Sequence, residues 1–101
     1  MDLQRIAGRL EALGSVTRLD IYRTLVRAGD DGLAVGELQG RTGLARSTLS
    51  HHLHKLIDVG LVSQERRGTT LVCRADYTVM RQTLGSLAAE CCADADRSEA
   101  A

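Results

Sequence analysis

The chain has 101 residues and a formal net charge of zero, from 13 basic and 13 acidic side chains. This length is typical of one small domain, and we expect that domain over residues 1–95, followed by a disordered tail over 96–101. The balanced charge argues against a protein that binds nucleic acid by bulk charge, although it is compatible with a local basic face. Tyr22 and Tyr77 are the only Phe, Tyr or Trp residues, so the core must be built from aliphatic side chains.

Two features of the chain bear on where it works. No apolar run approaches the roughly 20 residues that cross a membrane, and the start M-D-L-Q-R-I-A-G lacks the apolar core of a secretory signal. Three cysteines, two of them adjacent, make a poor disulfide framework. We therefore expect a cytoplasmic protein with reduced thiols and no membrane partner.

Helical spacing marks the first two elements. Apolar side chains recur through residues 2–13 and predict a helix that Gly14 ends. Ser15 predicts the cap of a second helix, which ends near residues 28–29, because its hydroxyl can accept a free N–H of the first turn. The apolar residues of the first helix are Leu3, Ile6, Ala7, Leu10 and Leu13, and the expected buried side of the second is Val16, Leu19, Ile21, Tyr22, Leu25 and Val26.

The middle of the chain predicts two helices joined by a sharp turn. After the turn G-D-D-G, we expect a short strand at residues 33–34 and a compact helix over 35–41. Thr42 and Gly43 form the sharp turn, and a longer helix runs over 45–59 until Gly60 ends it. This longer helix is amphipathic, with Leu49, Leu53, Leu56 and Ile57 expected inside and Ser47, Ser50, His51, His54, Lys55 and Asp58 outside.

The last third of the chain predicts a β-hairpin and a final helix. Residues 61–64 and 69–74 are expected strands around the turn E-R-R-G, whose glycine permits a tight geometry and whose two arginines project from it. A helix starts near Tyr77. Its apolar residues Met80, Leu84, Leu87 and Cys91 follow 4, 3, 4 spacing, a narrow seam suited to a partner helix.

The order helix, turn, helix, hairpin predicts a mainly helical winged helix-turn-helix that reads DNA, because such a helix fits the major groove with its leading residues at base edges. This unit contains six basic residues (positions 41, 46, 55, 66, 67 and 74) and two acidic ones (58 and 65). The alternative is an ordinary helix with a solvated polar face. The predicted DNA-binding residues are Arg46, Ser47, Thr48, Ser50, His51, His54, Lys55, Arg66 and Arg67.

The histidines at positions 51, 52 and 54 raise the question of a metal site. His51 and His52 point about 100° apart on a helix, and only His51 and His54 share a face. No second cluster of ligands completes a set in the sequence. Roles on the DNA face or in helix packing are therefore favoured over metal binding.

The central segments resemble the ArsR/SmtB family of small dimeric winged-helix repressors. The resemblance covers most of residues 10–74 and is carried by L-E-A-L-G-S-V-T-R-L-D-I-Y-R-T-L-V, T-G-L-A-R-S-T-L-S-H-H-L-H-K-L-I-D-V-G-L-V and R-R-G-T-T. It implies a homodimer built from the first and last helices, which binds operator DNA near its own promoter and releases it when an inducer binds. Val16 stands where a proline is common in the family, and Ala45 where a serine or threonine often sits.

Two sensor sites that are common in this family have no counterpart in the sequence. Where arsenic and cadmium sensors of the family often carry Cys-x-Cys in the third helix, this sequence has L-A-V-G-E-L, without cysteine. The zinc sensors use His and carboxylate ligands on the last helix, which has no histidine here. The A-E-C-C ending resembles a subgroup with arsenic-binding cysteines after the last helix. It implies Cys91 and Cys92 as soft thiolate ligands, with Cys73 as the remaining candidate, for a trivalent arsenical inducer (arsenite or methylated arsenite) or the chemically similar antimonite, and with no cofactor needed for DNA binding.

Helix length limits how these cysteines can meet. From Tyr77 to Cys91 a helix advances about 21 Å, so Cys73 is not expected to reach Cys91 of its own chain. If the last helices pair antiparallel across a two-fold axis, Cys73 of one subunit can join Cys91 or Cys92 of the other.

Other functions stay open at this point. The same fold can serve a thiol-based redox or reactive-sulfur sensor, the cysteines can be structural, and the domain can be an interaction module that does not bind DNA. An enzyme is not expected, because the sequence pattern supports no nucleophile–base pair, phosphate loop or metal-water site.

Overall fold

The computed structural model describes residues 2–95. Its elements follow the predicted order and confirm a mainly helical winged helix-turn-helix with a small β-hairpin. The tail predicted over 96–101 lies outside the described residues. The elements are α1 (Leu3–Leu13), α2 (Val16–Ala28), β1 (Leu33–Ala34), α3 (Val35–Thr42), α4 (Arg46–Asp58), β2 (Val62–Arg67), β3 (Thr70–Ala75) and α5 (Tyr77–Ala88).

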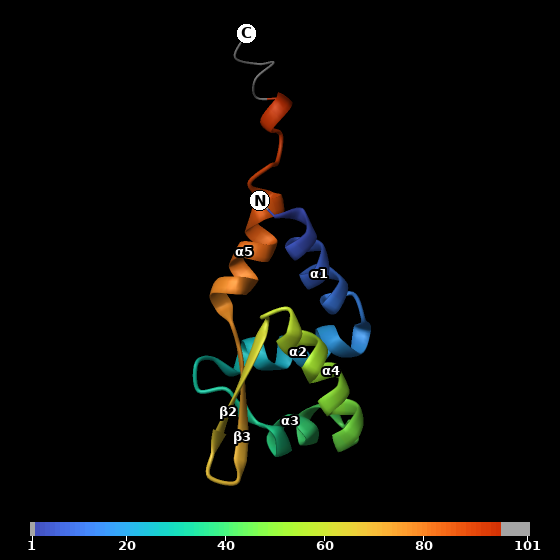
Figure 1. Ribbon diagram of the computed structural model, residues 1–101, viewed down its shortest axis with the longest axis vertical. Helices are drawn as coiled ribbons and strands as arrows, with labels where there is room; N and C mark the ends of the chain where they lie inside the picture. Colours follow the sequence, from blue (N-terminus) through green and yellow to red (C-terminus); the bar gives the residue numbers. More distant parts are fainter. Residues whose placement is uncertain (1, 96–101) are drawn as a thin grey trace.

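Strand β3 is the centre of the small sheet. β1 and β2 both pair with it antiparallel, and Cys73 lies opposite Leu33 on one side and Gln64 on the other. Figure 1 shows the β2–β3 hairpin reaching away from the body at one end of the molecule, with α2, α3 and α4 grouped around its base. β3 therefore leads directly from the hairpin tip into α5.

Side-chain caps set where three of the helices begin, at Asp2 for α1, Ser15 for α2 and Asp76 for α5. The Ser15 hydroxyl accepts the Arg18 N–H at 3.3 Å, and the Asp76 carboxylate accepts the Val79 N–H at 3.0 Å. A cap of this kind typically stabilises a helix by about 1 kcal/mol. The cap predicted at Ser15 and the start of the last helix predicted at Tyr77 are both confirmed.

The core lies between the sheet and helices α2, α3 and α4. Leu49, Leu53 and Leu56 of α4 are at most 1 % exposed, which confirms their predicted burial. Burying one such side chain contributes about 1.5–3 kcal/mol. Other buried members of this core are Ile21, Tyr22, Leu25, Leu33, Val35, Leu38, Leu61, Val62 and Cys73.

The first turn of α2 departs from the prediction. Val16 and Leu19 are 89 % and 51 % exposed, so their predicted burial is wrong. At about 100° per residue, Val16 lies on the side of the helix opposite Leu25, which faces the core. Val16 and Leu19 instead line an open surface groove that also includes Leu44.

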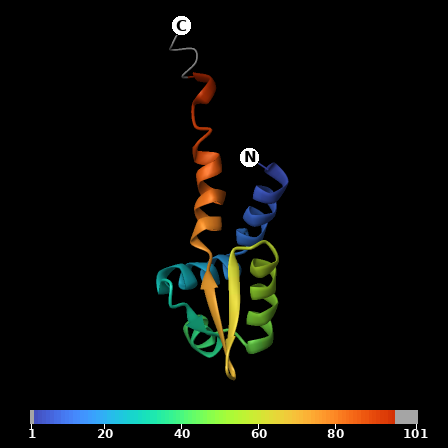
Figure 2. The ribbon, with the colours of Figure 1, turned by 60° about the vertical axis from the view of Figure 1, so that its left-hand side comes forward.

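Helices α1 and α5 rise from the body side by side, on the side away from the hairpin tip (Figures 1 and 2). Four leucines on these helices are exposed, and exposed apolar side chains that gather on one surface are typical of an interface. No helix in residues 2–95 is long and apolar enough to cross a membrane. The exposed leucines are Leu3 and Leu10 of α1 and Leu84 and Leu87 of α5.

The predicted continuation of the last helix to Cys91 is wrong. α5 ends at Ala88, and the Cys91 N–H donates to the Ala88 carbonyl at 3.1 Å, three residues back instead of four. Cys92 has a φ of 61°, a left-handed conformation that an α-helix of L-residues does not contain. The apolar seam therefore stops at Leu87, and the two cysteines belong to the turn that follows.

Arg9 is buried, although the sequence places it among the polar residues of the first helix. It is 8 % exposed, and its Nε donates to the Val59 carbonyl at 3.3 Å. Val59 is the C-cap of α4, where the helix dipole favours a cation. Arg9 therefore fastens α1 to the C-terminal end of α4.

Replacing Arg9 with methionine should lower the free energy of unfolding by about 1–3 kcal/mol, because a charge-assisted hydrogen bond is lost and a part-buried carbonyl loses its partner. The matched control is Arg5→Met, on the exposed side of the same helix, with an expected change within about 0.5 kcal/mol. Urea denaturation followed by circular dichroism measures both variants. Wild-type stability of the Arg9 variant would contradict this role.

Candidate nucleic-acid interface and thiol pair

Helices α3 and α4 form a helix-turn-helix around Gly43. This glycine has a φ of 73°, and its N–H donates to the Gln39 carbonyl at 2.9 Å. A left-handed conformation of this kind favours glycine. α4 then starts at Arg46 with no side-chain cap, so the N–H groups of its first turn are left for water or an anionic partner.

The outer side of α4 is polar along its length. Its three buried leucines hold the opposite side in the core, which determines the side that solvent reaches. Ser50 is half-buried, and the other predicted DNA-binding residues of the helix are exposed. The structure thus places them where a groove of DNA can be reached, and their contacts with DNA stay a prediction. The exposed residues are Arg46, Ser47, Thr48, His51, His54 and Lys55.

His52 is half-buried, whereas the other two histidines, His51 and His54, are exposed. Its Nδ1 lies 3.3 Å from Nη1 of Arg18, and Arg18 also donates through Nε to the Ala12 carbonyl at 2.7 Å. Burial, and next the positive charge of Arg18, lower the pKa of His52. A neutral imidazole can accept the arginine N–H. His52 therefore links α4 to the junction of α1 and α2.

The first strand of the hairpin is longer, and its turn shorter, than predicted. The β2–β3 ladder continues to the pair Arg67–Thr70, which leaves Gly68 and Thr69 as the turn, and Gly68 has a φ of 62°. The prediction that Arg66 and Arg67 lie in the turn is therefore wrong, since both belong to β2. Successive strand residues point to opposite faces, so the two arginines diverge.

Arg66 lies on the face of the hairpin that continues into the core. It lies on the same face of β2 as Val62 and Gln64, which pair with Ala75 and Cys73 of β3. Arg66 is exposed, and no hydrogen bond or ion pair joins its side chain to another residue between positions 2 and 95. Its guanidinium is therefore unpaired near the hairpin tip.

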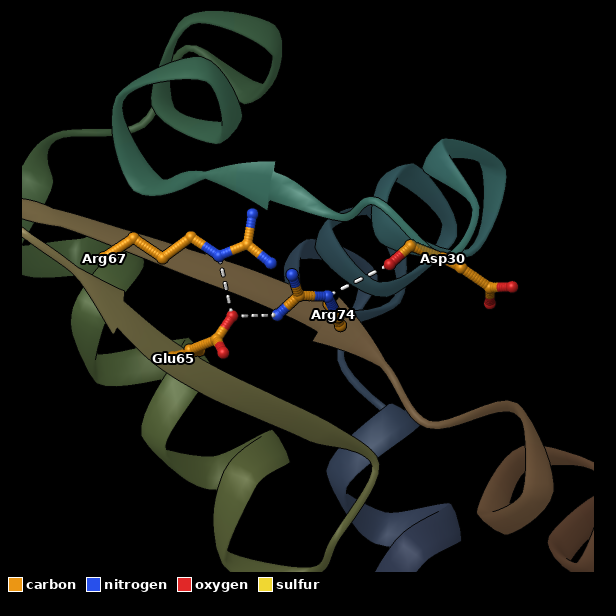
Figure 3. Close-up of polar contacts among 4 residues, drawn as sticks. All are labelled: Asp30, Glu65, Arg67 and Arg74. Carbon is orange, nitrogen blue, oxygen red and sulfur yellow. Dashed lines mark hydrogen bonds and ion pairs between the residues drawn. The ribbon is translucent and has the colours of Figure 1, made fainter.

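Arg67 is held by Glu65 on the other face (Figure 3). Oε1 of Glu65 accepts from Arg67 Nε at 2.9 Å and from Arg74 Nη1 at 3.1 Å. Arg74 in turn donates through Nε to the Asp30 carbonyl at 3.0 Å. The hydrogen bonds from Arg67 and then Arg74 lower the pKa of the Glu65 carboxyl, so this group is ionised at neutral pH.

Glu65, Arg74 and Asp30 are absent from the predicted site residues. Glu65 and Arg67 are two positions apart in a strand, so alternation alone could have placed them on one face. The contact between Arg74 and Asp30 spans 44 residues. No local pattern in the sequence indicates such a contact.

Cys73, one of the predicted thiolate ligands, lies in the core. It is 0 % exposed, and the Gln64 side-chain amide donates to its Sγ at 3.4 Å. Burial raises the pKa of the Cys73 thiol, and the Gln64 hydrogen bond opposes that rise only in part. The thiol is therefore protonated and unreactive at neutral pH.

Cys91 and Cys92 form an exposed pair of free thiols whose Sγ atoms are 3.4 Å apart. Helix α5 has twelve residues, so about 18 Å of helix separates this pair from the strand that carries Cys73. The three cysteines do not come together within one chain. Among residues 2–95, no cluster of three or more His, Cys, Asp or Glu side chains could hold a metal ion.

Brief treatment of the native protein with iodoacetamide should modify Cys91 and Cys92 and leave Cys73 unmodified, because a buried, protonated thiol neither meets nor attacks the reagent. Unfolding in denaturant with an isotopically heavy reagent then labels Cys73. Mass spectrometry of the peptides measures the ratio at each cysteine. Equal native labelling of Cys73 and the pair would contradict its burial.

A helix-turn-helix with an outward polar second helix and a basic hairpin beside it defines a winged-helix DNA-binding domain. Comparison with known proteins gives the same class. A family model described as a helix-turn-helix domain matches residues 13–65.

Two relatives match by sequence. The nodulation protein NolR of Rhizobium meliloti is 36% identical over 86 residues, which are 85% of this chain and 68% of that protein. A protein of Halobacterium salinarum, named as a candidate arsenical resistance operon repressor, ArsR2, is 35% identical over 60 residues. That second match covers 59% of this chain and half of the relative.

Solved structures of similar fold point the same way. An ArsR-like transcriptional regulator from Rhodococcus sp. RHA1 has a TM-score of 0.79 and 26% identity, over 97% of this chain and 89% of that one. A homodimeric winged helix-turn-helix DNA-binding domain from Mycobacterium bovis has a TM-score of 0.70 and 29% identity, over 88% and 82% of the two chains. The chain belongs to the ArsR family of DNA-binding transcriptional regulators.

Proposed function

We propose that this protein is a homodimeric repressor that binds double-stranded operator DNA and releases it when a trivalent arsenical binds its cysteine thiolates. DNA binding is carried by one observation, the uncapped and polar outer face of α4 above a fully buried row of leucines. Arsenical binding is supported by the exposed thiol pair. The candidate inducers are arsenite, methylated arsenite and the chemically similar antimonite.

In this proposal α4 enters the major groove and the hairpin lies along the flanking backbone. Arg46 begins α4, where side chains of a recognition helix reach base edges. Its guanidinium can take a guanine edge or a phosphate. Arg66 brings an unpaired positive charge to the hairpin tip, where it can meet a phosphate or the minor groove.

The exposed leucines of α1 and α5 support a dimer. Two copies that cover Leu84 and Leu87 against each other would remove apolar surface from water, at about 25 cal/mol per Å². A two-fold dimer presents two copies of α4 to half-sites one helical turn, about 34 Å, apart. The homodimeric domain of similar fold from Mycobacterium bovis is consistent with this assembly.

Substituting Arg46 with alanine should weaken binding to the DNA upstream of the protein's own gene by about 5- to 150-fold, the loss expected for one specific arginine contact of about 1–3 kcal/mol. Arg5→Ala, on the helix away from the hairpin tip, is the control and should bind like the wild type. Fluorescence anisotropy at several KCl concentrations measures the affinity. Absence of salt-sensitive binding by the wild type would contradict the proposed function.

The thiol pair suits an arsenical with two free valences. A monomethylated trivalent arsenical with two hydroxyl groups keeps its carbon bond and forms two As–S bonds, one to each cysteine, while its two As–O bonds break and each hydroxyl leaves as water with a thiol proton. Arsenite itself takes three thiolates. Cys73 from the other subunit would have to leave the core to supply the third, so we place Cys91 and Cys92 at the centre of the site.

The position of the pair offers a route to DNA release. Cys91 and Cys92 lie in the turn after α5, which ends at Ala88 and is the helix proposed to join the two subunits. An arsenical that favours one arrangement of these helix ends would favour one spacing of the two α4 helices. A coupling of about 1–3 kcal/mol lowers operator affinity by roughly 5- to 150-fold.

The double variant Cys91→Ser/Cys92→Ser should bind operator DNA normally and no longer release it on addition of methylated trivalent arsenic. Cys73→Ala is the matched control: release by arsenite as in the wild type would exclude Cys73 as the third ligand. Titrations followed by anisotropy measure release. If the wild-type protein releases DNA on addition of peroxide and not of any arsenical, the result would favour a redox sensor, the second function that adjacent free thiols support.

A further inference from the structure

We propose that Glu65 is a restraint on the hairpin, which holds Arg67 away from DNA until a phosphate displaces the carboxylate. Glu65 thereby sets how strongly the hairpin contributes to DNA affinity. The inference rests on the proposed DNA binding and adds Glu65, which is not one of its predicted contacts. Of the two adjacent arginines of β2, Arg67 is then paired with Glu65 and Arg66 is unpaired before DNA binds.

The restraint is anchored in the body of the protein. Arg74, whose side chain is 24% exposed, bonds both the Glu65 carboxylate and the Asp30 carbonyl in the turn before β1. Glu65 and Arg67 are more open, with side chains 52% and 63% exposed. Arg74 thus fixes the position of the Glu65 carboxylate relative to the body of the protein, and the carboxylate in turn holds the Arg67 side chain.

The direction of Arg67 follows from this anchoring. Figure 3 shows its side chain extended along the sheet toward Arg74, with its guanidinium beside the Glu65 carboxylate. Arg66 is on the opposite face and has no such partner in residues 2–95. Before DNA binds, strand β2 therefore presents one free positive charge and one that is paired.

An exposed ion pair of this kind is weak enough to exchange. Pairs between solvent-exposed side chains add little to stability and are screened by salt. A DNA phosphate can therefore compete for Arg67. The exchange leaves the Glu65 carboxylate without that partner close to the DNA backbone, so binding is weaker than for a hairpin with a neutral residue at this position.

The test is a double-substitution cycle in the full chain. Glu65→Gln keeps the shape of the side chain and removes its charge, and Arg67→Gln removes the arginine. Binding to a duplex of the DNA upstream of the protein's own gene is measured by fluorescence anisotropy over a KCl series. Glu11→Gln, an exposed acid on α1, has the same change in net charge and is the control.

Glu65→Gln should raise affinity about three- to tenfold at low salt and steepen the salt dependence by up to roughly one unit per subunit, since one more phosphate contact is fully made. Arg67→Gln should have little effect in the wild type and a clear loss in the Glu65→Gln background. Glu11→Gln should leave both quantities unchanged.

Three results would overturn the proposal: unchanged or weaker binding by Glu65→Gln, an equal gain from Glu11→Gln, or the same gain from Glu65→Gln with and without Arg67. The last would mean that Glu65 acts on DNA by its own charge. A wild-type protein that fails to bind the duplex would overturn the proposed function itself, and the inference with it.

Discussion

The packing of α4 against the core is the constraint on which the rest of the structure depends. Leu49, Leu53 and Leu56 are almost completely buried, and rotating the helix to expose them would cost several kcal/mol. The rotation of α4 about its axis is thereby fixed, and so is the side that faces outward. Arg9 and His52 add contacts from α1 and from the α1–α2 junction. The polar face of α4 is consequently presented by a rigid support, as recognition of a groove requires.

The hairpin uses a different physical principle, because its tip has no core of its own. Its outer half is positioned by the ladder between β2 and β3 and by the contacts of Glu65 with Arg67 and Arg74. These contacts are exposed and therefore weak. The two parts proposed to face DNA thus differ in rigidity: α4 is fixed by buried apolar surface, and in our proposal the hairpin charges rearrange when a phosphate approaches.

The three thiols also differ in burial, since one lies in the core and two lie on the surface. Cys73 is part of the packing between the sheet and the helices, where burial keeps its thiol neutral. Cys91 and Cys92 lie beyond the end of α5 and are open to solvent. A sensor built on the exposed pair would act on the helix ends without disturbing the core, which favours a switch in the arrangement of subunits over one in the fold of each subunit.

Local patterns in the sequence determined most of the fold. Three features are each set by neighbours within a few residues, so periodicity and cap chemistry predicted them. They are the spacing of leucines in α4, the cap at Ser15 and the end of α4 before Gly60, which has a φ of 81°. The same reasoning placed the polar residues of α4 on its outer side. It also predicted that Cys73 and Cys91 do not meet within one chain.

The tertiary structure alone decided which faces are covered. Arg9 is buried and Val16 is exposed because of where α4 and the core happen to lie, information that the periodicity of α1 and α2 does not contain. Arg74 connects the Glu65 carboxylate, which also accepts from Arg67, to the Asp30 carbonyl 44 residues away in the sequence. A local pattern reports which side of an element is apolar, whereas the partner of each side chain depends on contacts between distant segments, and those exist only once the chain has folded.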